Sequence, residues 1–436
     1  MTIDYHDLKQ QAETLRQQER FSEALPLYDK LWNAVGDNKD VWIGWRYAQC
    51  LRKLGRSEEA LEICRQVYQI DSEFDRNNNL YGWCVYDTGI RQPKDKVDEK
   101  KLLKAAEAIT TLTQQGEYSP YEMAVFAVVE HFESYKNTPK PIPYDDILMW
   151  LDKLDPTTLS KQPSTGSDGK SYASSKEKWY RSRAKALLEL QHYADCVEVC
   201  SEALAEISPL HNDFDVWFRW YRANSLVALG KAKEALADLE YVMERKSDWW
   251  VVYKYAQALH EVDEIDNAIS YAAKAALPAG GLGFRWELFL DLGNMLAEAG
   301  QHDVAIKHVF LAAAIRQEEG WKSVAKLQTA LEQMNLSEEN LPQAKILHRE
   351  LQPFWKSVQP KPRTTHKGYI IRIHANGKSG NIRVDSTGAE HFFGMRSYKG
   401  DATPEVGMRV MFNLREQENK KTGKLELHAV DIYPDS

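Results

Sequence analysis

Side chains that could perform catalysis or bind a metal are scattered in this sequence. Cys196 and Cys200 lie four residues apart in an apolar helical pattern, and no histidine is paired with them. Because small thiols are common in the cores of proteins kept in reducing compartments, they indicate core positions and not a zinc site. The glycine-rich stretch at residues 280–283 lies between two helical patterns instead of after a strand, which indicates a linker. The motifs GxxxxGKS/T, GxSxG and HExxH do not occur, so we expect no enzyme activity, no cofactor and no metal.

The charge distribution suggests a second kind of chemistry, contact with a polyanion. The net charge of the chain is −8, but residues 361–436 hold 13 Lys and Arg against 9 Asp and Glu. An acidic body with a basic C-terminal part indicates that only this part would attract nucleic acid. Ordinary surface chemistry is the alternative explanation for so small an excess. The candidate nucleic-acid-binding residues are Arg372, His374, Lys378, Arg383, Phe392, Arg396 and Lys399.

Indole rings that recur in helical patterns suggest a third kind of chemistry, recognition of a protein segment. Trp42 and Trp45 recur as Trp217 and Trp220, and an amide side chain follows four residues after the second ring of each pair. Aromatic rings beside amides suit an extended peptide or a helix of a partner. The alternative is that some of these rings pack between adjacent helices. The candidate protein-binding residues are Trp42, Trp45, Gln49, Trp217, Trp220, Asn224, Trp250, Tyr253, Gln257 and Asn294.

A repeated unit must position these rings, because two distant segments share one spacing. Residues 41–74 and 216–249 both contain VW followed by W, then LG and EAL at the same positions. Small residues recur at the eighth and twentieth positions, for example Ala48 and Ala60 in the first segment. Small residues at these positions allow two antiparallel helices to approach closely, and six units of the chain share the spacing.

The repeated unit resembles the tetratricopeptide repeat, a helix–turn–helix unit of about 34 residues. The resemblance implies a mainly α fold, a right-handed superhelix of helical hairpins, with eight helix pairs between residues 5 and 319. It also implies that positions 2, 5, 9 and 12 of each unit line a concave groove in which a protein partner binds. The carboxylate clamp of the family has lysine at position 5. Here that position is aromatic or, at Leu290, aliphatic, which argues against an acidic C-terminal tail bound through the clamp.

Beyond residue 366 the side-chain period changes to two, which predicts a small five-stranded β-barrel of the oligonucleotide-binding type. The segments KSGNI at 378–382, HFFGM at 391–395 and EVGMRVMF at 405–412 resemble the cold-shock domain. The two base-stacking aromatics of that family's second strand are absent where Asn381 and Ile382 stand, which implies weak binding of RNA or single-stranded DNA. The predicted strands are 368–374, 379–385, 390–395, 407–416 and 423–432.

The expected organisation is two half-arrays of helix pairs joined by a polar loop, then capping helices, a Pro-rich linker and the barrel. No apolar run reaches the roughly 18 residues that a membrane span requires, and no secretory signal is visible. We therefore expect a cytoplasmic protein without membrane contact. The expected bounds of the six parts are 1–160, 161–176, 177–319, 320–356, 357–366 and 367–436.

These observations together predict a non-enzymatic adaptor whose helical array binds a protein partner and whose barrel contacts RNA or single-stranded DNA. One alternative is a pure protein scaffold in which the barrel is a docking or oligomerisation module. Another is a regulator whose array senses a peptide. The architecture resembles bacterial repeat proteins with a cold-shock-like tail domain, some of them associated with phage-conflict systems, which implies a role in antiviral defence.

Overall fold

The computed structural model describes residues 5–34, 39–93, 96–166, 168–278, 280–360, 366–375, 377–400, 403–418 and 425–435. The chain divides into two units, Met1–Ala268 and Ile269–Ser436. The first unit is almost entirely helical, and the second combines helices with a closed β-barrel.

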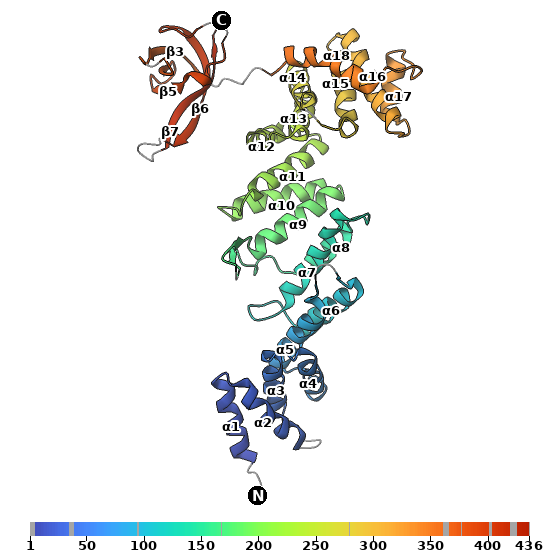
Figure 1. The fold of residues 1–436 in the computed structure, drawn as a ribbon, viewed down its shortest axis with the longest axis vertical. Helices are drawn as coiled ribbons and strands as arrows, with labels where there is room; N and C mark the ends of the chain where they lie inside the picture. The colour runs from blue at the N-terminus through green and yellow to red at the C-terminus, as the bar shows by residue number, and fades with distance from the viewer. Residues whose placement is uncertain are drawn as a thin grey trace. The chain divides into compact units, whose positions relative to one another are not determined.

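Helices follow one another in pairs along the first unit, and the last of them crosses into the second unit (Figure 1). They are α1 (Tyr5–Gln17), α2 (Phe21–Ala34), α3 (Val41–Lys53), α4 (Ser57–Ile70), α5 (Asp75–Val85), α6 (Glu99–Leu112), α7 (Tyr121–Glu133), α8 (Tyr144–Leu151), α9 (Ser175–Glu189), α10 (Tyr193–Glu206), α11 (Phe214–Ala228), α12 (Ala232–Arg245), α13 (Trp249–Glu261) and α14 (Ile265–Ala276).

Small residues at the helix contacts explain why the pairs form. Ala48 and Ala60 are fully buried, as the repeat spacing predicts. Gly44 shows how close α3 approaches its neighbours, since an added Cβ would lie 2.5 Å from side-chain atoms of Trp32 and Val67. Gly55 makes the turn between α3 and α4 with φ of +77°, a conformation that favours glycine.

Two segments of the first unit depart from a regular array. After α5 the chain continues as a π-helical turn, Tyr86–Ile90, before the insertion that precedes α6. Gly89 permits this packing, because an added Cβ would lie 2.5 Å from Cβ of Ala105. The polar loop predicted at 161–176 contains a two-stranded hairpin, β1 (Ser164–Thr165) and β2 (Ser171–Tyr172).

Further helices follow α14 in the second unit. They are α15 (Trp286–Glu298), α16 (His302–Glu318), α17 (Ala325–Gln333) and α18 (Ala344–Ser357), preceded by a 3₁₀ turn at Gly283–Arg285. Both α17 and α18 contact α16, and they lie in the segment predicted to form capping helices, with α18 ending one residue beyond its expected end at 356. The guanidinium of the buried Arg285 donates to the carbonyls of Ala276, Pro278 and Gly280, which ties down the glycine-rich linker.

A polar pair inside the apolar contact fixes α18 on α16. Trp355 is fully buried and stacks on Phe289 with ring centroids 5.6 Å apart. Its Nε1 donates to Nε2 of the buried His308 at 2.8 Å, and Nδ1 of His308 lies 2.8 Å from the carbonyl of Val304. Burial lowers the pKa of His308 to about 4, so the imidazole is neutral and can accept the indole proton.

The barrel is closed, with strand order β3-β4-β5-β7-β6. Strands β5 and β7 pair in parallel, and the other neighbours are antiparallel. Alternate residues face inward, and Ile370, Ile382, Phe393, Phe412 and Ile432 form the fully buried core. The strands are β3 (His366–Ile373), β4 (Ser379–Val384), β5 (Glu390–Gly394), β6 (Arg409–Glu418) and β7 (Leu425–Pro434).

The predicted fold class, helical repeats followed by a five-stranded barrel, is confirmed. Residues 361–365 of the predicted linker, Asn376 in the turn before β4, and the predicted start of the last strand at 423–424 lie outside the described residues. Among the described residues, no helix is both long enough and apolar enough to span a membrane.

Candidate interaction surfaces

The first group of predicted residues surrounds Trp42 and Trp45 on α3. The two indoles meet edge to face with centroids 6.0 Å apart, and Phe74 lies 4.8 Å from Trp42 and 6.5 Å from Trp45. Trp42 is 41% exposed, while Trp45 is half-buried against the core of α3, α4 and α5. Asp40 caps α3 by accepting from the backbone N–H of Trp42 at 2.9 Å. We call Trp42, Trp45 and Phe74 the first indole cluster.

Arginines surround the first indole cluster. The guanidinium of Arg76 on α5 lies over both indoles, 5.4 and 5.7 Å from the ring centroids. Arg46 lies 5.9 Å from the centroid of Trp42 and pairs with Glu13 at 3.2 Å. Glu13 also accepts from Arg16 at 2.6 Å, and this hydrogen bond is the main reason that the pKa of Glu13 is lowered to about 2. Glu13 is therefore ionised at neutral pH and engages two of these arginines.

The second group lies on α11 and α13. Trp217 stacks on Trp250 with centroids 6.3 Å apart, and Trp220 meets Trp250 edge to face at 4.6 Å. All three rings are half-buried, and Trp220 and Trp250 pack against a core of valines from α11, α12 and α13. These contacts join adjacent repeats, as expected if the rings pack between helices, yet they leave part of each ring accessible. We call these three residues the second indole cluster.

The predicted amides beside the rings are engaged within the chain. Oε1 of Gln49 accepts from Arg16 at 2.9 Å, which links α3 to α1. Nδ2 of Asn224 donates to the backbone carbonyl of Trp220 at 2.7 Å, one turn earlier on the same helix. Each amide keeps part of its hydrogen-bonding capacity, but neither is a wholly open recognition group.

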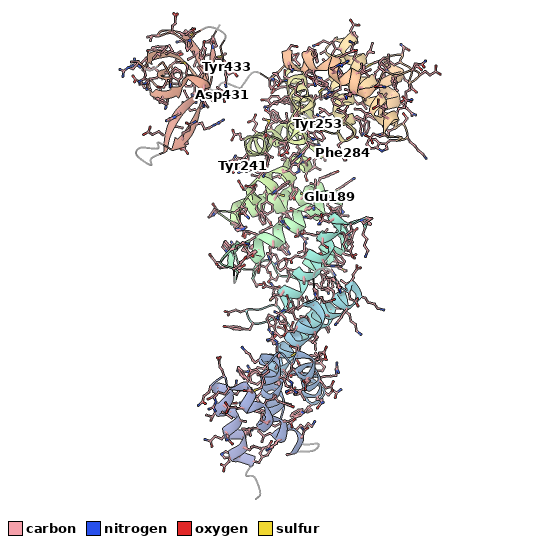
Figure 2. All side chains as sticks on the ribbon, viewed as in Figure 1. Glu189, Tyr241, Tyr253, Phe284, Asp431 and Tyr433 are labelled. Atoms are coloured by element: carbon pink, nitrogen blue, oxygen red, sulfur yellow. The ribbon has the colours of Figure 1, made fainter. Side chains whose placement is uncertain are left out.

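The remaining predicted residues are Tyr253 and Gln257 on α13 and Asn294 on α15. Tyr253, labelled in Figure 2, stacks on Trp249 with ring centroids 6.5 Å apart, and Gln257 lies half-buried one turn further along α13. Asn294 belongs to the second unit, where it lines a cavity of about 480 Å³ together with His302 and other residues of α15, α16 and α17. The predicted protein-binding set is thus divided between the two units of the chain.

On the barrel, Phe392 is the centre of an exposed aromatic face. Phe393 is fully buried, so Phe392, 39% exposed, is the ring that faces outward. The ring of His374 lies 6.1 Å from that of Phe392, and the ring of His428 lies 5.0 Å away on the other side. Nε2 of His374 lies 2.9 Å from Oδ1 of Asn381, in hydrogen-bonding distance. This arrangement presents one aromatic platform flanked by two imidazoles.

The predicted basic residues of the barrel are in different electrostatic states. Arg372 faces Asn381 across β3 and β4 and is exposed. Arg383 donates to Glu390 at 2.5 Å, so its charge is matched within the barrel. Lys378 is exposed just before β4, and Arg396 and Lys399 are exposed in the segment after β5.

Within the described residues, no cluster of His, Cys, Asp and Glu has the makings of a metal site. Cys196 and Cys200 are buried, and the Sγ of Cys196 donates to the carbonyl of Ala184 at 3.3 Å. Burial raises the pKa of Cys200 well above its usual value, which keeps that thiol protonated and unreactive. Both cysteines lie in the core, as their spacing indicates.

Two parts of the chain match models of known families. The tetratricopeptide-repeat family matches residues 15–84, and a domain of unknown function, DUF7017, matches residues 216–352. The first match coincides with the helix pairs and buried alanines of α1 to α5. The array contains tetratricopeptide repeats. The search of curated proteins found no match.

Solved structures with similar folds include MamA from Desulfovibrio magneticus RS-1, which is 16% identical with a TM-score of 0.33 and covers 43% of this chain and 93% of its own. YrrB, a TPR protein with an unusual peptide-binding site, is 16% identical with a TM-score of 0.35, covering 49% and 92%. The human IFIT1 dimer with PPP-AAAA is 13% identical with a TM-score of 0.35, covering 79% and 74%. Scores this low carry no argument about function, so the repeat assignment depends on the family match and the helix pairs.

Sequence reasoning missed two residues of these surfaces. Arg76 lies 34 residues after Trp42, so the repeat length alone places it at the equivalent position of the next repeat. His428 lies beside Phe392 because β7 pairs in parallel with β5, and these two residues are in register. The first could have been found from the period, whereas the second depends on a strand pairing that no local pattern shows.

A buried ion pair between α11 and α12 was also missed. Asp238 is 3% exposed and accepts from Arg222 at 2.6 and 2.8 Å and from Arg219 at 2.9 Å. Tyr241, labelled in Figure 2, lies 4.3 Å from the guanidinium of Arg219 and 3.5 Å from that of Arg245. These arginines beside the second indole cluster are thus engaged within the repeats.

Proposed function

We propose that this protein is a non-enzymatic adaptor, in which the tetratricopeptide array binds a protein partner and the barrel contacts single-stranded nucleic acid weakly. The observation that carries the first part is the grouping of partly exposed indoles on α3, α11 and α13, the first helices of three helix pairs. Partly exposed tryptophans held rigidly by their neighbours are the side chains that contribute most to protein interfaces. A cytoplasmic location and a role in antiviral defence belong to this proposal and depend on the sequence alone.

The second part is supported by Phe392 and the exposed cations around it. Stacking of a base on one aromatic ring contributes about 1–3 kcal/mol. Among the described residues of the barrel, Phe392 is the one aromatic ring that is largely exposed, and Arg383 is already paired with Glu390. Binding would therefore be weak and governed mainly by phosphate contacts with residues such as Arg372. The strand order, with its parallel β5–β7 pair, is compatible with an oligonucleotide-binding barrel.

A second candidate for the barrel is a protein-docking module. The salt bridges Arg383–Glu390 and Arg409–Asp385 favour it, because they neutralise two of the arginines that a nucleic-acid surface would use. The nucleic-acid candidate predicts measurable binding of an oligonucleotide at low salt, whereas the docking module predicts none.

The barrel is tested by fluorescence anisotropy of labelled oligo-U and oligo-dT with the full-length chain over a salt series. Phe392→Ala should weaken binding by removing the platform, and Arg372→Gln should weaken it and flatten the salt dependence. Val406→Ala, another exposed apolar side chain of the barrel, is the matched control. Absence of binding at low salt would favour the docking module.

The array is tested by affinity purification with the wild-type chain and with a Trp42→Ala, Trp217→Ala double variant. The same partner, identified by mass spectrometry, should be lost with the double variant and kept with Tyr118→Ala, which removes a ring that is 77% exposed outside both clusters. A partner that the double variant retains fully would contradict the assignment of the indole clusters.

A further inference from the structure

The guanidinium of Arg76 lies beside the first indole cluster without a carboxylate partner among the described residues. Arg76 lies over both indoles, yet among the described residues it forms no ion pair with a carboxylate. Its neighbours Arg46 and Arg16 differ, because both contact Glu13, at 3.2 and 2.6 Å. Arg76 is exposed, and the two indoles beside it orient its guanidinium, so its five N–H donors suit a carboxylate supplied from outside.

Other carboxylates of the first three repeats are already engaged by other cations. Arg52 and Arg91 share a single carboxylate, Asp87, at 2.7 and 3.3 Å. Lys9 pairs one to one with Asp40 at 2.9 Å. Among the described residues of the first three repeats, none of these ion pairs includes Arg76.

The acidic residues nearest to Arg76 in the sequence serve another surface. Glu73 and Asp75 line a separate depression of about 500 Å³, together with Tyr68, Asn78 and the segment that follows α6. They are therefore turned towards α6, whereas Arg76 is turned towards α3. The positive charge beside the indoles is not matched by these neighbours.

The indole faces argue for a peptide and against nucleic acid at this place. Base stacking needs an open aromatic face. Trp42 has two guanidinium groups within 6 Å of its centroid and Phe74 at 4.8 Å, and Trp45 is half-buried. Part of Trp42 remains accessible beside the guanidinium of Arg76, which suits an aliphatic side chain next to a carboxylate.

We propose that the first three repeats bind an acidic, extended segment of the partner protein, with one of its carboxylates paired to Arg76 and a neighbouring apolar side chain on Trp42. This inference depends on the proposed protein-binding function and specifies the chemistry of the partner. Two parallel N–H···O bonds from the guanidinium would make this pair stronger and more specific in geometry than a single contact. It uses an arginine on α5, and not the lysine-based clamp that the sequence argues against.

The test uses the full-length chain and three fluorescein-labelled peptides of equal length, in which Leu alternates with Glu, with Gln or with Lys. The Glu peptide should bind most tightly, and its affinity should fall as salt rises. Arg76→Gln should lower that affinity about tenfold, as expected for loss of a charged hydrogen-bonded pair, and should leave the Gln peptide unchanged. Arg56→Gln is the matched control, because Arg56 is exposed and already paired with Glu59 at 2.6 Å. Circular dichroism of both variants shows whether the fold is intact.

The outcomes separate the inference from the function on which it depends. Equal binding of the Glu and Gln peptides, lost on Trp42→Ala but unaffected by Arg76→Gln, would overturn the acidic specificity and leave protein binding intact. No binding of any peptide would overturn the inference, while the affinity purification still decides the adaptor role. Displacement of the Glu peptide by unlabelled oligo-U, lost in Arg76→Gln, would assign this surface to nucleic acid instead.

Discussion

The buried pair of His308 and Trp355 makes the docking of α18 dependent on pH. His308 is fully buried, and its Nε2 accepts the indole proton of Trp355 at 2.8 Å. Protonation of that nitrogen would remove the acceptor and place a charge among apolar side chains. Burial accordingly lowers the pKa of His308 from 6.5 to about 4. Burial also lowers the pKa of His348, which lies on α18 itself.

The sign and size of the effect follow from proton linkage. Because the pKa is lower in the folded state, the open state binds the proton more readily. The contribution to stability is therefore fully present above about pH 6.5 and is lost as the pH falls towards 4. A lowering of the pKa from 6.5 to about 4 corresponds to about 3 kcal/mol at a pH below both values, and to about 2 kcal/mol at pH 5.

Hydrogen–deuterium exchange of the α18 amides, corrected for the intrinsic exchange rate at each pH, measures this opening. Protection of α18 should fall about thirtyfold between pH 7.5 and pH 5, which is about 2 kcal/mol. In His308→Gln, whose amide oxygen can still accept from the indole, most of this dependence should disappear. The exposed His302→Gln on the same helix is the control. Protection of α18 that is independent of pH, or equally pH-dependent in His308→Gln, would refute the reasoning.

Three further substitutions test the packing. Asp238→Asn should destabilise the first unit by about 3 kcal/mol in urea unfolding, because two arginines of α11 lose their buried partner; a loss below about 1 kcal/mol would contradict that role. Gly44→Ala should lower the stability by about 1–3 kcal/mol, since the added Cβ would lie 2.5 Å from Trp32, and an unchanged melting temperature would argue against the close approach. Phe393→Ala should cost the barrel about 3–5 kcal/mol, whereas Phe392→Ala should cost much less; equal losses would show that both rings are core.

The helical repeats could be predicted because their determinants are local and periodic. Ala48 and Ala60 recur at a fixed spacing and are buried in the structure, so the period alone located the helix contacts. The barrel strands could be predicted from alternation for the same reason. Alternation could not decide which of Phe392 and Phe393 faces inward, since neighbouring residues point to opposite faces and both are aromatic.

Features that depend on contacts between distant segments could not be predicted. The engagement of Gln49 by Arg16 joins two helices across 33 residues, and nothing in either segment requires it. The neighbourhood of Phe392 and His428 depends on a parallel pairing of strands separated by β6. The pairing of Arg383 with Glu390 needs the register of β4 against β5 before it can be seen. In each case the residue type was visible in the sequence, but the partner that the side chain contacts was not.

The two indole clusters share ring type and repeat position but differ in the charge they offer a partner. In the second cluster the nearby arginines are committed, since Arg219 and Arg222 pair with Asp238 and Arg245 lies over Tyr241. In the first cluster Arg76 keeps its charge available to an outside carboxylate. One array would therefore present an apolar site and a cationic site on first helices of different repeats. A partner segment with an acidic part and a separate apolar part would be selected by both, and its affinity would depend on salt only through the acidic part.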